Sequence, residues 1–146
     1  MITNDVQYRT TKSHLTRFDQ AATNLARQLD QDPDSQLIRL ELAAVRSQAD
    51  DLRHEIAEYE ALKSGEITTL TATSLADVAS LLIKARIARG WTQGRLAEAL
   101  GVAEQQVQRY EATLYRSASL ARICDIADAL NITITERAEL GNPSAA

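Results

Sequence analysis

The 146-residue sequence has one cysteine, two histidines and no long run of apolar residues. Each of these shortages excludes a class of protein. A single cysteine, Cys124, excludes a disulfide within the chain and any metal site built from several cysteines. His14 and His54 lie far apart with no cysteine beside them, so zinc-ligand spacing is missing. No apolar run reaches about 18 residues, and the first five residues lack the charged-then-apolar order of a signal peptide. We expect a cytoplasmic protein without a metal or another cofactor.

Aromatic residues make up only 4% of the chain, and the motifs of common enzymes are missing. Sheets that stack the bases of single-stranded nucleic acid need clustered aromatics, which this sequence does not supply. The sequence contains no glycine-rich phosphate loop, no nucleophile elbow and no plausible Ser/His/Asp set. These absences argue against an enzyme.

The charge is unevenly distributed, although the net charge of −4 is modest. Residues 1–73 hold 8 basic and 12 acidic side chains, whereas residues 74–146 hold 8 of each. Within residues 84–116, six basic side chains meet three acidic ones, a local surplus of +3. The sequence therefore gathers its cationic surplus into one short segment.

Residues 1–63 carry the pattern of an antiparallel helical hairpin. Apolar positions recur at alternating spacings of three and four in two segments, and neither glycine nor proline interrupts residues 34–64. We expect Asp32 to be the N-cap of the second helix, with Pro33 at its first position. Leu37 and Leu40 add an apolar edge outside this seam. The two seams are Leu15, Phe18, Ala22, Leu25 and Leu29, then Ile38, Leu42, Val45, Ala49, Leu52, Ile56 and Tyr59.

A threonine-rich linker or short strand, residues 64–73, follows the hairpin. Threonine and isoleucine favour extended backbone, and residues 131–136 show the same alternation near the other end of the chain. We expect these two segments to pair as a small β-ribbon. Between them, Ser74 and Asp77 form a capping box that begins a second lobe, residues 74–146.

Residues 81–132 predict four short helices with tight connections, inside an all-α fold. Thr92 is suited to cap a helix over residues 93–100, and Gly101 to supply the left-handed turn that ends it. A helix over 103–112 follows, and a last helix over 120–130 carries Cys124 on its apolar face. Two helices joined by so short a glycine turn indicate a helix-turn-helix.

This segment resembles the Cro/C1-type (Xre) helix-turn-helix family over about 50 residues. The resemblance implies sequence-specific binding of double-stranded DNA by a homodimer on a palindromic operator. It rests on Arg86, Gly90, Thr92, Gln93, Leu96, Ala97, Leu100, Gly101, Val102, Val107, Arg109, Glu111 and residues 127–130.

The resemblance also assigns roles to individual residues. Arg86 and Glu111 match an internal salt bridge of the family. Three positions depart from the family pattern. Ala103 replaces a common capping serine and Gly94 replaces a good helix former, each at a cost of about 1 kcal/mol. Leu114 stands where a polar or basic phosphate contact is common, so this corner is expected to pack against protein instead. The residues expected to contact bases are Glu104, Gln105, Gln106 and Arg109. The residues expected to contact phosphates are Gln93, Arg95 and Arg116.

The hairpin leaves three functions open. Its layout before a helix-turn-helix is similar to that of HigA-type antitoxins, which neutralise a toxin ribonuclease and repress their own operon. We therefore expect a nucleoid-associated repressor that acts as the autoregulating antitoxin of a toxin–antitoxin operon. One alternative is a phage-type or metabolic repressor whose hairpin is merely a dimerising coiled coil. The other is a protein-interaction adaptor that does not bind DNA.

Overall fold

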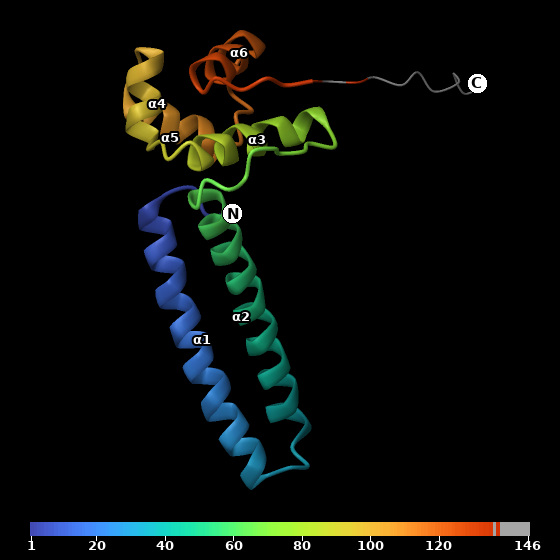
Figure 1. Cartoon of the computed structure of the whole chain (residues 1–146). Helices are drawn as coiled ribbons and strands as arrows, with labels where there is room; N and C mark the ends of the chain where they lie inside the picture. The colour runs from blue at the N-terminus through green and yellow to red at the C-terminus, as the bar shows by residue number, and fades with distance from the viewer. Residues whose placement is uncertain (136, 138–146) are drawn as a thin grey trace, which may run out of the picture.

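A computed structural model describes residues 1–135 and 137, which contain six α-helices and no β-strand. Two long helices form an arm that projects from a compact lobe of four shorter helices (Figure 1). The predicted all-α fold, with a hairpin followed by a helical lobe, is confirmed. Within these residues, no helix is both long and apolar enough to cross a membrane. The helices are α1 (Asp5–Gln31), α2 (Gln36–Lys63), α3 (Leu75–Ala88), α4 (Gln93–Leu100), α5 (Glu104–Ala112) and α6 (Leu120–Ala129).

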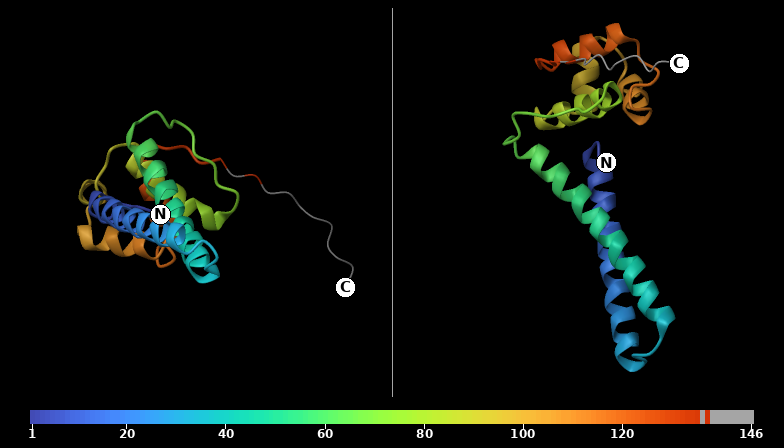
Figure 2. Two further views of the ribbon diagram at one scale, coloured as in Figure 1. Left: turned by 90° about the horizontal axis from the view of Figure 1, so that it is seen from below. Right: turned by 90° about the vertical axis from the view of Figure 1, so that its right-hand side faces the viewer.

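The arm is a two-helix hairpin packed along the predicted seam. On α2 the seam residues Leu42, Ala49, Ile56 and Tyr59 are buried. None of the residues of α1, all of them described, is buried, and the helix packs against α2 alone along the arm. The arm therefore presents long helical faces to the surroundings, as both views in Figure 2 show.

The turn at the tip of the arm differs from the prediction. Helix α1 runs through Gln31, and Asp32 closes it by donating its backbone N–H to the carbonyl of Gln28 at 3.0 Å. The N-cap of α2 is Ser35, whose hydroxyl accepts from the backbone N–H of Ile38. The predicted N-cap at Asp32 was wrong, because α2 begins three residues later and Ser35 caps it. Pro33 therefore lies in the turn between the two helices.

The open end of the arm joins the core of the lobe. Ile2, Ile56, Tyr59 and Leu62 belong to the same buried cluster as the central residues of α3, α4, α5 and α6. At this junction Asp5 accepts hydrogen bonds from the ammonium of Lys63 at 2.7 Å and the hydroxyl of Tyr59 at 3.0 Å. These two bonds lower the pKa of Asp5, with the Lys63 bond contributing most. Arm and lobe therefore share one hydrophobic core.

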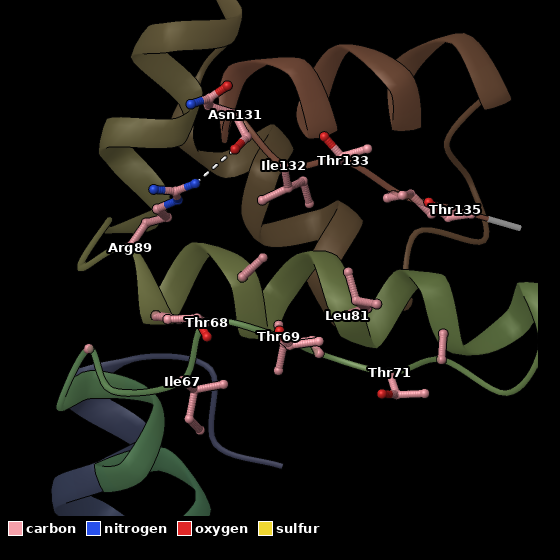
Figure 3. A pocket seen from close by; sticks show the side chains of 16 residues that line it. Ile67, Thr68, Thr69, Thr71, Leu81, Arg89, Asn131, Ile132, Thr133 and Thr135 are labelled. Atoms are coloured by element: carbon pink, nitrogen blue, oxygen red, sulfur yellow. Dashed lines mark hydrogen bonds between the residues drawn. The ribbon is translucent and has the colours of Figure 1, made fainter.

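The two threonine-rich segments do not form the predicted ribbon. Residues 66–72 and 132–135 carry neither a helix nor a strand assignment, and residues 64, 65 and 131 lie in turns. They lie on either side of α3, whose residues Leu81, Ala85 and Ala88 separate them (Figure 3). Both segments have a composition that favours strands. They do not pair within one chain because α3 lies between them.

The inward face of α6 also differs from the prediction. Ser119 caps this helix, and its buried contacts come from Ile126 together with Leu130 at its end. Cys124 is two residues before Ile126, which is about 200° around a helix, so its thiol is exposed. Leu120 is exposed as well. The expectation of a core cysteine was therefore wrong.

Candidate nucleic-acid interface

Helices α4 and α5 are joined by a three-residue turn with well-defined ends. The hydroxyl of Thr92 accepts from the backbone N–H of Arg95 at 3.1 Å, which satisfies a free donor at the start of α4. Gly101 ends α4 with a φ of 66°, in the left-handed region where a side chain is disfavoured. This turn sends the chain into α5 across the end of α4.

A buried network of charged and polar groups fixes α5 against α3 and α4. Arg86 on α3 donates from Nε to Oε1 of Glu111 at 2.6 Å and from Nη2 to Oε2 at 2.8 Å. Gln93 at the start of α4 donates from Nε2 to the same Oε2 at 2.7 Å. Arg86 and Glu111 are only 2% and 3% exposed. Because the pair is bidentate and buried, it restricts the orientation of α5 as well as its position.

The same guanidinium connects the lobe to the arm. Nη1 of Arg86 donates to the backbone carbonyl of Trp91 at 2.7 Å, and Nη2 donates to the carbonyl of Thr3 at 2.8 Å. Arg86 and Glu111 thus form the expected ion pair, and Arg86 has two further partners that sequence reasoning missed. The loop before α4 and the start of the chain are held by one side chain.

The side chain of Gln93, expected to contact a phosphate, lies in the buried network instead. Gln93 is 8% exposed, and its side-chain amide nitrogen donates a hydrogen bond to the carboxylate of Glu111. The side chain therefore lies inside the network. As the first residue of α4, Gln93 has a backbone N–H without a partner within the helix. Free N–H groups in that position are suited to bind an anion.

The outer face of α5 is polar and accessible. Glu104, Gln105 and Arg109 are exposed, whereas Gln106 is half-buried. Sequence reasoning missed Gln108, which is exposed and donates from Nε2 to Oε1 of Glu104 at 3.3 Å. The spacing of four residues between Glu104 and Gln108 was the available signal for this contact.

Gly94 allows α4 and α5 to approach closely. A Cβ built at Gly94 would lie 3.2 Å from Oε2 of Glu104, closer than a side chain normally tolerates. The carboxylate of Glu104 therefore lies over the first turn of α4. The glycine that weakens α4 as a helix is explained by this approach.

The basic residues around the motif divide into internal and exposed groups. Lys84 pairs with Glu58 of the arm, and Arg86 is buried, so neither contributes surface charge. Arg95 lies over the ring of Trp91, with its guanidinium carbon 4.6 Å from the ring centroid. Within residues 84–116 the exposed charges are Arg89, Arg95, Arg109 and Arg116 against Glu98 and Glu104.

Arg116 follows a tight turn at the end of α5. Leu114 and Tyr115 have φ angles of 49° and 56°, in a region that non-glycine residues rarely adopt. Tyr115 holds this turn because its ring is buried and stacks on Tyr110, with ring centroids 6.0 Å apart. Burial raises the pKa of the Tyr115 hydroxyl. The turn leaves Arg116 exposed next to the end of α5, and nothing in the structure explains the exposed Leu114.

Comparison with known families identifies the lobe. Residues 82–137 match the sequence model of a helix-turn-helix family of the Cro/C1 type. This part of the lobe is therefore similar to a helix-turn-helix domain. The match supports a DNA-binding transcription regulator, and the family is a regulatory family rather than an enzyme family. Comparisons with curated proteins and with solved structures gave no significant match.

The helix-turn-helix domain has one helix whose N-cap residue bears no side-chain acceptor. Ala103 has the φ of −70° and ψ of 144° typical of an N-cap, before α5. We expect Ala103→Ser to stabilise the protein by about 1 kcal/mol, because its hydroxyl would accept a free N–H of α5. Urea unfolding followed by circular dichroism measures this gain. Ala99→Ser, at an exposed position in the last turn of α4, should give none, and an equal gain from both variants would contradict the capping argument.

Proposed function

We propose that this protein is a homodimeric repressor that binds a palindromic operator in double-stranded DNA. The observation that carries the proposal is the combination of a polar, accessible α5 with the buried Arg86–Glu111 pair beneath it. In a helix-turn-helix the second helix enters the major groove. A helix that reads bases benefits from a fixed orientation, because bidentate contacts to base edges tolerate little displacement.

The exposed side chains suit a division between base and phosphate contacts. Arg109 can bind guanine through two hydrogen bonds, Gln105 can bind adenine in the same way, and Glu104 can accept from cytosine. Gln106 is half-buried and would contact the edge of the reading surface. Arg95, Arg116 and the backbone N–H of Gln93 are then the groups for phosphates, which set register without reading sequence.

The test is a fluorescence-anisotropy titration of the purified protein at two salt concentrations. One duplex carries the DNA upstream of the protein's own gene, and the other carries the same bases scrambled. We expect the upstream DNA to be preferred and its affinity to fall with salt, because phosphate contacts release counterions. Equal, weak binding to both duplexes would contradict the proposal and favour a protein-interaction adaptor.

We further propose that the arm binds a toxin protein, which would make the chain an autoregulating antitoxin. The supporting observation is the apolar pair Leu37 and Leu40, which are 66% and 69% exposed on α2 near the tip of the arm. Large apolar side chains gathered at such a position are typical of a protein interaction surface. The alternative, a phage-type or metabolic repressor, needs the arm for dimerisation alone.

Leu40→Asp separates these two functions of the arm. We expect the variant to lose binding to the product of the neighbouring gene while keeping its dimer and its operator affinity, because a carboxylate would have to be buried in the apolar contact. Ser47→Asp, two turns further along the outer face of α2, is the matched control. Pull-down and light scattering provide the measurements. Loss of the dimer in Leu40→Asp would favour the coiled-coil alternative.

A further inference from the structure

Trp91, the only tryptophan of the chain, lies just before α4 and is held by two hydrogen bonds to Arg86. Its backbone N–H donates to the carbonyl of Arg86 at 3.0 Å, and its own carbonyl accepts from Nη1 of Arg86 at 2.7 Å. Because Arg86 is also paired with Glu111 of α5, these bonds set the position of Trp91 relative to that helix. The half-buried indole ring is therefore a platform in fixed register with α5.

Arg95 lies on this platform. Its guanidinium carbon is 4.6 Å from the centroid of the Trp91 ring, which is a cation–π contact. Glu98 is one turn further along α4, yet among the described residues the side chain of Arg95 forms neither an ion pair nor a hydrogen bond. Because stacking uses the face of a guanidinium, the N–H groups at its edge remain available for a ligand.

Helix stability does not account for a cation at this position. Arg95 is exposed and is the third residue of α4, where the helix dipole disfavours a positive charge. An anion beside Arg95 would offset this cost, since negative charge is favoured at the same end of a helix. An exposed guanidinium with a free edge and no acidic partner suits the phosphate group of a nucleic acid.

We propose that Trp91 is a positioning residue that holds Arg95 in the orientation that binds a DNA phosphate. Arg95 is the group that contacts DNA, and Trp91 acts through it by restricting its rotamers before DNA is bound. A side chain that is already ordered loses less entropy on binding. The contacts that run from Glu111 through Arg86 to Trp91 also keep this phosphate contact in register with α5. The proposal rests on the DNA binding proposed above.

The stacking contact is tested by the fluorescence of Trp91, which no other tryptophan obscures. Acrylamide, a neutral quencher, measures how accessible the indole ring is. We expect the quenching constant to rise in Arg95→Ala, because loss of the guanidinium uncovers one face of the ring. Arg17→Ala, on the arm, should leave the constant unchanged. An unchanged constant in Arg95→Ala would overturn the proposal, since Trp91 would not hold Arg95 in solution.

The effect on DNA binding is tested by a double-mutant cycle of Trp91→Leu and Arg95→Ala in the full chain. Fluorescence anisotropy measures binding to the DNA upstream of the protein's own gene and to the scrambled duplex, at two salt concentrations. We expect Trp91→Leu to weaken binding to both duplexes alike, by about twofold to tenfold for each protomer that contacts DNA, because Arg95 must then be ordered during binding. In the Arg95→Ala background, Trp91→Leu should cost nothing further. Trp91→Leu keeps the charge of Arg95, and should therefore keep the salt dependence that Arg95→Ala reduces.

Arg95→Lys covers the case in which Trp91→Leu fails to fold, as judged by circular dichroism. The substitution changes an exposed side chain and keeps its charge, but an ammonium lacks the planar face by which a guanidinium stacks on the ring. We expect Arg95→Lys to weaken binding to both duplexes by the same factor of about two to ten for each protomer. Trp91→Phe, which keeps an aromatic face, should recover part of the affinity that Trp91→Leu loses. Wild-type affinity in Arg95→Lys would overturn the proposal.

The outcomes separate this proposal from the proposed function. If the losses from Trp91→Leu and Arg95→Ala add in the double variant, Trp91 acts independently of Arg95 and the positioning role is overturned. If the wild-type protein binds both duplexes equally, operator recognition is overturned, and the cycle on either duplex still decides the role of Trp91. A wild-type protein that binds neither duplex would overturn both proposals.

Discussion

Replacing Arg86 with alanine is expected to remove about 3–5 kcal/mol from the free energy of unfolding. The substitution leaves the carboxylate of Glu111 buried, with the amide of Gln93 as its remaining hydrogen-bond donor. It also removes the donors to the carbonyls of Trp91 and Thr3. Urea denaturation followed by circular dichroism measures the loss. Arg46→Ala, at an exposed arginine of α2, should change the free energy by about 0.5 kcal/mol or less.

A double variant tests the physical cause of this loss. Replacing a whole buried ion pair by apolar residues of similar volume is often neutral, because no charge remains to be desolvated. Arg86→Met combined with Glu111→Leu should therefore recover most of the stability that Arg86→Ala loses. Such a protein would fold, yet α5 would lose the bidentate contact that orients it. If the double variant were no more stable than Arg86→Ala, the loss would come from the missing hydrogen bonds to Trp91 and Thr3.

The helices could be predicted from the sequence because their end signals are local. Thr92 and Gly101 bound α4 as expected, and Ser74 with Asp77 begins α3. In α2, the spacing of Leu42, Ala49 and Ile56 places the predicted seam residues inward. These features depend on neighbours three or four residues away, which a sequence displays directly.

The features that the sequence did not predict depend on competition or on distant packing. Ser35 replaced Asp32 as a cap because both residues are chemically suited and the turn geometry decides between them. Cys124 turned outward because the helical phase of α6 is set by Ile126, which packs against elements far away in sequence. The threonine-rich segments carry no strand assignment, and no local signal indicates that α3 lies between them.

The candidate site shows the same division. Family resemblance placed Arg86 opposite Glu111, and composition placed exposed polar groups on α5. The burial of Gln93 and the approach of Glu104 to Gly94 depend on the angle between α4 and α5. This angle cannot be read from a single sequence. Gly94 has a low helix propensity and weakens α4, but it allows the close contact between α4 and α5.

Arg109→Ala is expected to weaken operator binding by about 1–3 kcal/mol for each half-site, and a dimer carries the change twice. Arg109 is exposed on α5, and no other residue of that helix is an arginine or lysine. A guanidinium that binds guanine through two hydrogen bonds also discriminates against other bases. The variant should therefore lose its preference at one base position in each half-site. Anisotropy titrations against operators altered at single positions would measure both effects.

The matched control is Arg17→Ala, which removes the same charge from the exposed surface of the arm. We expect it to leave operator affinity and base preference unchanged, since Arg17 lies about three helical turns along α1 from the end that joins the lobe. Arg95→Ala provides a second comparison, because removing a phosphate-binding guanidinium should weaken binding to all sequences alike and reduce the salt dependence. If Arg109→Ala behaved like Arg95→Ala, Arg109 would bind phosphate, and reading of bases would fall to Glu104 and Gln105.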